Sequence, residues 1–498
     1  MRRLLPLLLV PLFAAQAVPP TPAEVYGEFF RMVQISGVFP DEKDFVDCVP
    51  KRAPAEIVAD YEREKGKPGF DLRAFVRANF TTARSDTIRS HIEALWDQLA
   101  RNAVKPPEGS SLLALPRPYV VPGGRFQELY YWDSYFVMLG LMESGKIEAV
   151  RQMVENFAYL IETYGFIPNA NRSYYLTRSQ PPFFSLMLDL LAEKEGDDVY
   201  VEFRGALEKE YRFWMDENRG RVVSAEGFTL NRYHDDGDTP RDEQYATDVT
   251  LAKRASREVR ELYRNVRSAA ESGWDFSSRW FADGKDRATI RTTEILPVDL
   301  NGLLYHLETT LARARSLDRD ETGARAMTAQ AERRREAINE VFWSEKDGWY
   351  VDYDLTAKRR STELTLAGMM PFFLNIAPKE RIAPVAKTLE ARFLKPGGVV
   401  TTLRTTGEQW DAPNGWAPLQ WITIQGLRNY GQMPLAETIA RRWMKQNLAV
   451  YAATGKLMEK YDVIDLSKPG GGGEYPSQDG FGWTNGVLLR LLNLYGEP

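Results

Sequence analysis

Apolar positions recur along most of the chain at the spacing of one helix face. Between residues 147 and 164 they advance in steps of three and one, and Gly165 follows as a stop signal. This pattern predicts a helix over 147–164. Similar apolar stripes predict helices around 303–311, 327–342, 435–448 and 487–494.

Strand patterns are rare by comparison. The best period-two alternation is Gly-Trp-Tyr-Val-Asp-Tyr-Asp at 348–354, which predicts a small hairpin strand. The charged run 332–336 holds three arginines between two glutamates and is interpreted as the solvated face of its helix. No Gly/Ser-rich or Pro-rich linker divides the chain, because the prolines between 105 and 124 lead into an aromatic segment. We therefore predict one large all-α domain with a minor β-hairpin.

The first 17 residues have the parts of a secretory signal peptide. Arg2 and Arg3 precede the apolar run 4–13, and an A-x-A-like site ends at Ala17. A buried N-terminal helix is the alternative interpretation. The run is too short for a permanent membrane anchor, which needs about 20 residues, and no later stretch is long and apolar enough. We expect a mature chain of residues 18–498 that is periplasmic or secreted, and the near absence of cysteine favours a bacterial periplasm.

Composition limits the chemistry that is available. Cys48 is the only cysteine, so the chain has no internal disulfide, cysteine-based zinc site or iron–sulfur cluster. His91, His234 and His306 are too scattered for a metal-binding helix. A net charge of −5 provides no basic field for nucleic acid. Any acid–base chemistry is therefore expected to use carboxylates.

Seven of the 12 tryptophans lie in four short segments that are rich in glycine, proline and charge: 122–135, 271–280, 408–421 and 470–483. Aromatic faces beside carboxylates and amides suit a sugar, because its C–H faces are apolar and its hydroxyl rim needs hydrogen bonds. The alternative is that these loops cap helices and pack the aromatic rings between them. Composition favours the sugar site.

Carboxylate pairs are the groups that hydrolyse glycosidic bonds, one as acid and one as base or nucleophile. The candidates in or near the aromatic segments are Asp133, Asp275, Asp411, Glu459, Glu474 and Asp479. Composition alone does not choose among them, and each has a structural alternative as a capping or hydrogen-bonding residue. The glycine run 470–473 lacks the Lys-Ser/Thr end of a phosphate loop. No nucleophile elbow or His-Glu-x-x-His helix is present in the sequence.

The segments Pro-Gly-Gly-Arg-Phe-Gln-Glu-Leu-Tyr-Tyr-Trp-Asp-Ser-Tyr at 122–135 and Gln-Trp-Asp-Ala-Pro-Asn-Gly-Trp-Ala-Pro-Leu-Gln-Trp at 409–421 resemble the two signature motifs of the trehalases. The resemblance runs from Phe39 to Val487. It implies an (α/α)6 toroid and the inverting hydrolysis of α,α-trehalose. It also implies a general acid at Asp275, in Ser-Gly-Trp-Asp-Phe-Ser-Ser-Arg-Trp, and a general base at Glu459, in Glu-Lys-Tyr-Asp-Val.

The same resemblance implies the substrate contacts and the absence of a cofactor or metal. The implied contacts are Arg125, Trp132, Asp133, Asn169, Arg178, Ser179, Gln180, Arg241, Glu243, the Gly273 backbone and Glu474. One position departs from the family pattern, because Asp242 replaces the usual proline of Arg-Pro-Glu and adds charge and freedom to that loop. We expect a monomer that binds a small disaccharide and neither nucleic acid nor membrane.

Two other hypotheses remain at this point. A relative on the same toroid could act on another glucoside, since fold does not fix function. An exported sugar-binding protein could also have lost turnover, although the presence of both Asp275 and Glu459 argues against it.

Overall fold

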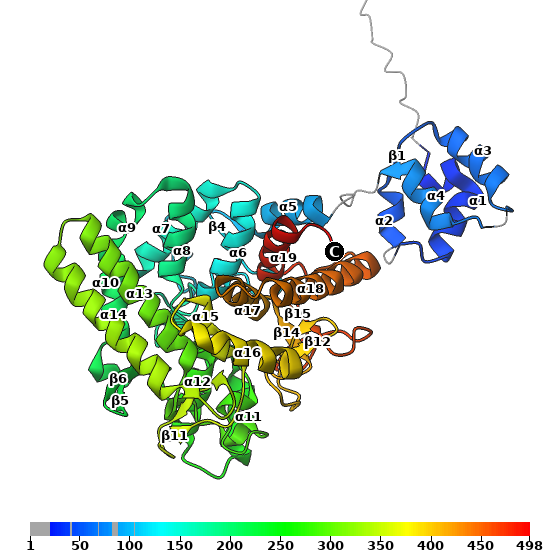
Figure 1. The fold of residues 1–498 in the computed structure, drawn as a ribbon. Helices are drawn as coiled ribbons and strands as arrows, with labels where there is room; N and C mark the ends of the chain where they lie inside the picture. The colour runs from blue at the N-terminus through cyan, green and yellow to red at the C-terminus, as the bar shows by residue number, and fades with distance from the viewer. Residues whose placement is uncertain (1–19, 40–41, 68, 82–87, 104) are drawn as a thin grey trace, which may run out of the picture. The chain divides into compact units, whose positions relative to one another are not determined.

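Helices make up most of the computed structural model, which describes residues 20–39, 42–67, 69–81, 88–103 and 105–498 (Figure 1). The predicted signal peptide, residues 1–17, lies outside these described residues. Two compact units divide the chain, with the boundary between His91 and Ile92. No linker-type composition marks this division in the sequence. The boundaries of the expected single domain, residues 18–498, stay a prediction.

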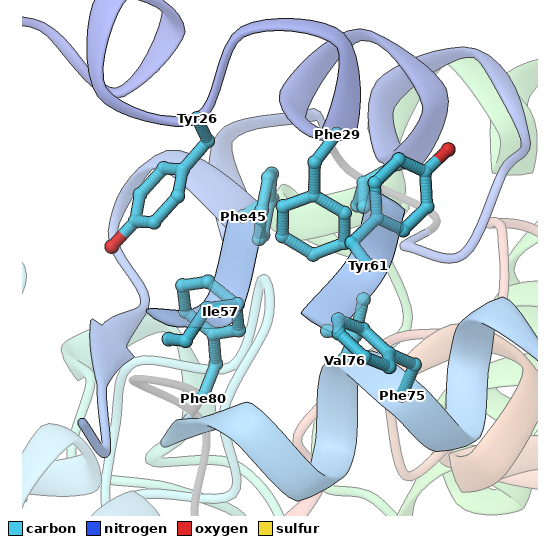
Figure 2. Close-up of a cluster of buried hydrophobic side chains, with 9 residues drawn as sticks. Tyr26, Phe29, Phe45, Ile57, Tyr61, Phe75, Val76 and Phe80 are labelled. Atoms are coloured by element: carbon cyan, nitrogen blue, oxygen red, sulfur yellow. The ribbon is translucent and has the colours of Figure 1, made fainter. Parts of the chain in front are cut away.

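The first unit is a small helical body with an aromatic core. Its helices are α1 (Pro22–Ile35), α2 (Glu42–Val46), α3 (Pro54–Glu64) and α4 (Leu72–Asn79), and a short sheet pairs β1 (Val49–Pro50) with β2 (Phe80–Thr81). Thr21 caps α1 in a reciprocal capping box with Glu24, which satisfies two backbone N–H groups. Phe29 is the centre of the core, with ring contacts to its aromatic neighbours at 4.9–6.2 Å (Figure 2).

The second unit has two classes of helix. The helices α6 (Tyr131–Glu143), α17 (Ala417–Asn429) and α19 (Gly482–Tyr495) are buried over nearly their whole circumference. The helices α7 (Ile147–Tyr164) and α14 (Glu321–Val341) bury one face and expose the other. A helix that is apolar all round belongs to an interior layer, and an amphipathic one covers it. The unit is therefore built as inner helices with outer helices around them.

The last helix packs along the first inner helix, so the chain closes its ring of helices (Figure 1). Two glycines allow the backbones of α19 and α6 to approach. A Cβ on Gly486 would meet the Phe136 carbonyl oxygen at 2.0 Å, and a Cβ on Gly140 would meet the Gly486 Cα at 2.5 Å. The closure of the ring thus depends on small residues at this crossing.

The remaining helices fill both layers of the second unit, and none of the described helices is both long and apolar enough to span a membrane. Their bounds are α5 (Ile88–Leu99, which crosses the unit boundary), α8 (Phe184–Glu195), α9 (Asp198–Glu202), α10 (Arg204–Trp214), α11 (Tyr245–Arg254), α12 (Val259–Glu271), α13 (Val298–Leu317), α15 (Met370–Phe373), α16 (Ile382–Thr388) and α18 (Met433–Thr454).

The helix predictions from periodicity are confirmed. The helix expected over 147–164 is α7, and Gly165 ends it in the left-handed conformation, with φ of 85°. The stripes at 303–311, 327–342, 435–448 and 487–494 fall on α13, α14, α18 and α19. The helices α7 and α14 cover an apolar layer with one face, so their sequences keep the period of that buried face.

All strands in the described part of the chain are short and antiparallel. The predicted strand 348–354 is divided into β9 (Trp349–Tyr350) and β10 (Tyr353–Asp354). The other strands of the second unit are β3 (Ala100–Arg101) with β4 (Tyr119–Val120), β5 (Val222–Ala225) with β6 (Phe228–Asn231), β7 (Ile295–Leu296) and β11 (Arg359–Arg360) with β10, β8 (Trp343–Ser344) with β9, β12 (Leu394–Lys395) with β13 (Gly398–Val399), and β14 (Asn414–Trp416) with β15 (Lys460–Asp462).

One interpretation from the sequence is corrected. Arg334, in the middle of the charged run 332–336, is 1% exposed and not part of a solvated face. Its guanidinium donates to Glu308 at 2.9 Å and to the side chains of Asn231 and Asn301 at 3.0 Å. The four neighbouring charged residues of the run are exposed. Charge spacing did not reveal this partner on α13, because it lies 26 residues away in the sequence.

Candidate active site

One cavity of the second unit is lined by residues from all four aromatic segments. The predicted site residues that line it are Arg125, Trp132, Asp133, Asn169, Arg178, Gln180, Arg241, Glu243, Gly273, Asp275, Glu459 and Glu474. These positions span 350 residues of sequence, so the fold, and not local sequence, brings them together.

Ser179 is the predicted site residue that does not line the cavity. Its backbone N–H donates to Glu271 at 2.9 Å, and its hydroxyl donates to the Ile167 carbonyl oxygen at 2.7 Å. Glu271 is the last residue of α12 and also accepts from Arg221 at 2.8 Å. Ser179 therefore anchors the loop that presents its neighbours Arg178 and Gln180.

Element ends place the three central carboxyl groups. Asp133 lies in the first turn of α6, and Asp275 follows α12 in the turn before a short 3-10 helix at Ser278–Trp280. Glu459 directly precedes β15, whose Lys460 is opposite Trp416 of β14. The pair of strands β14 and β15 thus joins the second signature segment to the residues that directly follow the predicted base.

Asp275 has an environment that favours its neutral form. Asp275 lines the cavity and is partly buried. Burial raises the pKa of Asp275 to about 7, and Glu474 adds to the rise, while Arg241 and Arg178 oppose it. The Trp274 and Phe276 side chains on either side of it are fully buried. A carboxyl group with this pKa can carry a proton near neutral pH and donate it to a leaving oxygen.

Glu459 has hydrogen-bond donors on both carboxylate oxygens. Lys460 Nζ donates to Oε2 at 2.9 Å, and the Tyr475 hydroxyl donates to Oε1 at 3.0 Å. Burial raises the pKa of Glu459, and Lys460, Tyr475 and the Gln478 backbone N–H counteract part of that rise. These donors favour the charged carboxylate, which is the form that a general base requires.

Asp133 and Glu474 are two further carboxyl groups of the cavity, and their pKa values are shifted in opposite directions. Burial raises the pKa of Asp133 well above its usual range, and the nearby Glu459 and Asp275 raise it further. Burial also acts on Glu474, but Arg241 and Arg287 outweigh it and leave its pKa below the ordinary value. Arg241 donates to Glu474 at 3.0 Å. Glu474 is therefore a charged structural partner of arginines rather than a free acid or base.

Two buried arginines line the wall of the cavity. Arg178 donates to Asn169 at 2.9 Å and to Glu243 at 2.6 Å. Arg241 makes a bidentate pair with Asp248 of α11, at 2.7 and 3.0 Å. Both guanidinium groups are thus fixed in direction by carboxylates behind them. Guanidinium groups held in this way can present their remaining N–H groups to sugar hydroxyls.

Asp242, which replaces the usual proline of the family pattern, leaves the ion pairs of Arg241 and Glu243 in place. Asp242 is exposed, and residues 242–244 form one turn of 3-10 helix. Arg241 and Glu243, on either side of it, both line the cavity and keep the ion pairs described above. The extra charge therefore lies at the surface, while the residues on either side of it line the cavity.

Five of the seven tryptophans of the four segments pack together in one cluster. Trp410 and Trp416 are parallel at 3.9 Å between ring centroids, and Trp274 and Trp132 lie 5.6 and 5.7 Å from Trp410. Trp483 packs edge-on against Trp416 at 5.6 Å. Four of these five rings line the cavity, and all are buried. The tryptophan surplus thus serves both interpretations, because the same rings pack the core and form the cavity wall.

Trp132 is in close contact with Gly273, which lies two residues before Asp275. A Cβ on Gly273 would meet the Trp132 indole at 2.8 Å, and Gly273 has a φ of 74°, which other residues rarely adopt. The two features make glycine the residue that fits at this position. The turn that leads to Asp275 therefore packs directly against the Trp132 indole of the first signature segment.

Comparison with known proteins gives a family for this arrangement. The family model described as Trehalase matches residues 84–496. The chain belongs to the trehalase family. It is 52% identical to the periplasmic trehalase of Pseudomonas aeruginosa, over 95% of this chain and 90% of the relative. It is 50% identical to that of Xanthomonas oryzae, over 97% and 88%.

Solved structures agree with this family. The neutral trehalase Nth1 of Saccharomyces cerevisiae matches with a TM-score of 0.64 and 27% identity, over 82% of this chain and 80% of that chain. A mannosylglycerate hydrolase from Thermus thermophilus matches with a TM-score of 0.53 and 18% identity, over 81% and 99%, and shows the fold alone. The predicted all-α (α/α)6 toroid is confirmed by these trehalase and hydrolase folds.

Several side chains of this trehalase-family site were missed by the sequence reasoning. Tyr475 and Trp483 line the cavity and lie in a segment that was selected for its aromatic content, which was the available signal. Tyr174 and Tyr175 also line it and lie outside the four segments. Arg287 donates to Glu474 and Glu408 from a stretch that carried no motif. Such contacts depend on tertiary structure alone.

Asp411 and Asp479, which were candidates from composition, have other roles. Asp411 is fully buried and accepts from Ser277, Ser278 and Thr402, so it holds the turn behind Asp275. Asp479 is paired with Lys456 at 2.8 Å at the surface. Neither lines the cavity.

Proposed function

We propose that this chain hydrolyses α,α-trehalose to two glucose molecules by an inverting mechanism, with Asp275 as general acid and Glu459 as general base. The observation that carries the proposal is the contrast between these two carboxyl groups in one trehalase-family cavity. Asp275 has a pKa near 7, and Glu459 has an ammonium and a hydroxyl as donors.

The acid step follows from the state of Asp275. A glycosidic oxygen is a poor leaving group unless it is protonated as the bond breaks. Asp275 can supply that proton because burial keeps its carboxyl neutral near pH 7. Arg241 and Arg178 oppose this effect, and their attraction helps the carboxylate that remains after the proton has left.

The base step uses Glu459. In an inverting hydrolysis, a carboxylate removes a proton from the water that attacks the anomeric carbon on the face opposite the leaving group. Lys460 and Tyr475 favour the charged form of Glu459 before the reaction starts. One product glucose is then released as the β-anomer and the other as the α-anomer.

The remaining cavity residues suit a disaccharide. Arg178 and Arg241 are fixed by carboxylates and can donate to hydroxyls, and the indoles of Trp132, Trp410 and Trp483 offer flat apolar faces. The side chains of Asn169 and Gln180 and the backbone of Gly273 add polar groups. Ser179 contributes by anchoring its loop. We propose that these groups, with Arg125, Asp133, Glu243 and Glu474, bind trehalose without a cofactor.

The chain is also proposed to act in the periplasm. The relatives at 52% and 50% identity carry the name periplasmic trehalase, and residues 1–17 have the pattern of a secretory signal. Removal of those residues would leave a mature chain of residues 18–498, which we expect to be a monomer. N-terminal sequencing of the exported protein tests the cleavage site after Ala17, and light scattering tests the oligomeric state.

Glucose release separates this function from its alternatives. The purified protein is incubated with trehalose and, in parallel, with maltose, and free glucose is measured over time. We expect rapid release from trehalose and little from maltose. Preference for maltose would indicate another α-glucosidase on the same toroid, and binding of trehalose without release would indicate a sugar-binding protein.

A further inference from the structure

Lys460 is a fully buried ammonium group beside the catalytic cavity that does not line it. A buried charge is costly unless it is paired and hydrogen-bonded, so the position of Lys460 requires a reason. The Nζ atom donates to Glu459 Oε2 at 2.9 Å and to Gln409 Oε1 at 3.0 Å. It also lies 5.1 Å from the Trp416 ring centroid and 4.9 Å from that of Tyr475.

Gln409 links Lys460 to Asp275, the proposed general acid, through hydrogen bonds. Its Nε2 atom donates to the main-chain oxygen of Asp275 at 2.6 Å, and its own main-chain oxygen accepts from the Trp416 indole at 2.9 Å. The side chain is 1% exposed and does not line the cavity. A single chain of hydrogen bonds therefore runs from the Glu459 carboxylate through Lys460 and Gln409 to the backbone of Asp275.

We propose that Lys460 and Gln409 are positioning residues that fix the two catalytic carboxyl groups relative to each other, with Lys460 also holding Glu459 in its charged form. Gln409 sets the direction of the ammonium because its amide oxygen accepts from Lys460 while its amide nitrogen is fixed on Asp275. Neither side chain contacts the space where the substrate binds. The inference rests on the proposed roles of Asp275 and Glu459.

The charge balance around Glu459 explains why one lysine matters. The titratable groups that interact with Glu459 are Lys460, Tyr475 and Asp133 of α6. Lys460 is the cation among them, and the other two are neutral or negative. Lys460 lowers a pKa that burial has raised, so removal of its charge should raise the pKa of Glu459 further.

The test is the pH profile of kcat/KM for Lys460→Met, Lys460→Arg and wild type with trehalose. Loss of the charge should move the acidic limb of the profile to higher pH by about 1–3 units, and K460R should stay close to wild type because it keeps the charge. Lys456→Met is the matched control, since Lys456 is an exposed lysine three residues before Glu459 that pairs with Asp479. Its acidic limb should not move.

An acidic limb of K460M at the wild-type position would overturn the inference, provided that Glu459→Gln is inactive in the same assay. If E459Q is active, the proposed base is wrong and the failure belongs to the proposed function.

Circular dichroism verifies that K460M is folded. If it is not folded, Gln409→Met decides, because it breaks the link and keeps both charged groups. We expect kcat to fall about 10–100-fold at a similar KM, and an unchanged kcat would refute the positioning role.

Discussion

Asp275 and Glu459 face the same cavity, and burial raises the pKa of both carboxyl groups, yet their partners differ. Asp275 has arginines at a distance. Among the described residues, no side chain donates a hydrogen bond to its carboxyl group. Glu459 has an ammonium and a phenol in direct contact. A third buried carboxyl, Glu210, accepts from Tyr131 and has no cation, and burial raises its pKa to about 8.

This comparison shows that burial alone does not assign a catalytic role. Burial favours the neutral form of every carboxyl group, so it prepares an acid without further help. A buried base needs donors that compensate the desolvation of its charge. The proposed assignment of acid and base therefore rests on this difference between the cations near Asp275 and the donors on Glu459.

The largest expected effect comes from removing either carboxylate. Asp275→Asn and Glu459→Gln should each lower kcat for trehalose by about 10³-fold or more, because one removes the proton donor and the other the base. Asp479→Asn is the control, since Asp479 is an exposed carboxylate that pairs with Lys456 and does not line the cavity. Turnover is measured by glucose release, and folding by circular dichroism. Near-normal turnover in either variant would exclude that residue from its role.

A smaller effect should follow from Arg241→Gln, which removes a cation that lowers the pKa of Asp275. The wild-type basic limb of kcat/KM should fall near pH 7, where Asp275 loses its proton. Arg241 lowers that pKa, so its removal should move the basic limb to higher pH and leave the acidic limb in place. Activity should also fall about 10–100-fold because a proposed substrate contact is lost.

Arg313→Gln is the matched control for this variant, because Arg313 is an exposed arginine that pairs with Asp197 away from the cavity. Its pH profile should equal that of wild type. A basic limb of R241Q that stays in place, or moves to lower pH, would show that Asp275 does not control it.

The smallest effect on activity is expected for Glu210→Gln, which instead tests the cost of burial on stability. Below about pH 4.5 the Glu210 carboxyl is neutral in both the folded and the unfolded chain. As the pH rises toward its folded pKa of about 8, only the unfolded chain ionises, so the free energy of unfolding falls. Denaturant titrations between pH 4.5 and 8 should show a loss of roughly 3–5 kcal/mol in wild type that E210Q lacks.

The exposed residue Glu336 of α14 provides the control, because Glu336→Gln should keep the wild-type dependence on pH. Equal slopes for wild type and E210Q would contradict the role of burial that the comparison assumes.

Local pattern predicted the parts of the molecule that depend on local physics. The apolar stripe and Gly165 defined α7, because a helix that covers a core repeats its buried positions every turn. Aromatic segments with glycine and charge located the cavity. Periodicity did not reveal the burial of Arg334, nor the boundary at residue 91, because both result from contacts between segments distant in sequence.

The assignment of acid and base needed more than composition. Glu474 and Glu459 are equally suitable in the sequence, and only the resemblance to trehalases preferred Glu459. The structure supplies a physical reason, because Glu474 accepts from Arg241 and Arg287, which lie 233 and 187 residues away along the chain. A carboxylate that is paired with two arginines cannot easily take a proton from water.

The anomeric form of the first product molecules tests the central claim most directly. Proton NMR follows trehalose hydrolysis in the first minutes, before mutarotation mixes the anomers. The account predicts equal amounts of α-glucose and β-glucose, since water attacks one anomeric carbon from the opposite face and the other ring keeps its configuration. Release of α-glucose alone would contradict inversion, and with it the roles of Asp275 and Glu459.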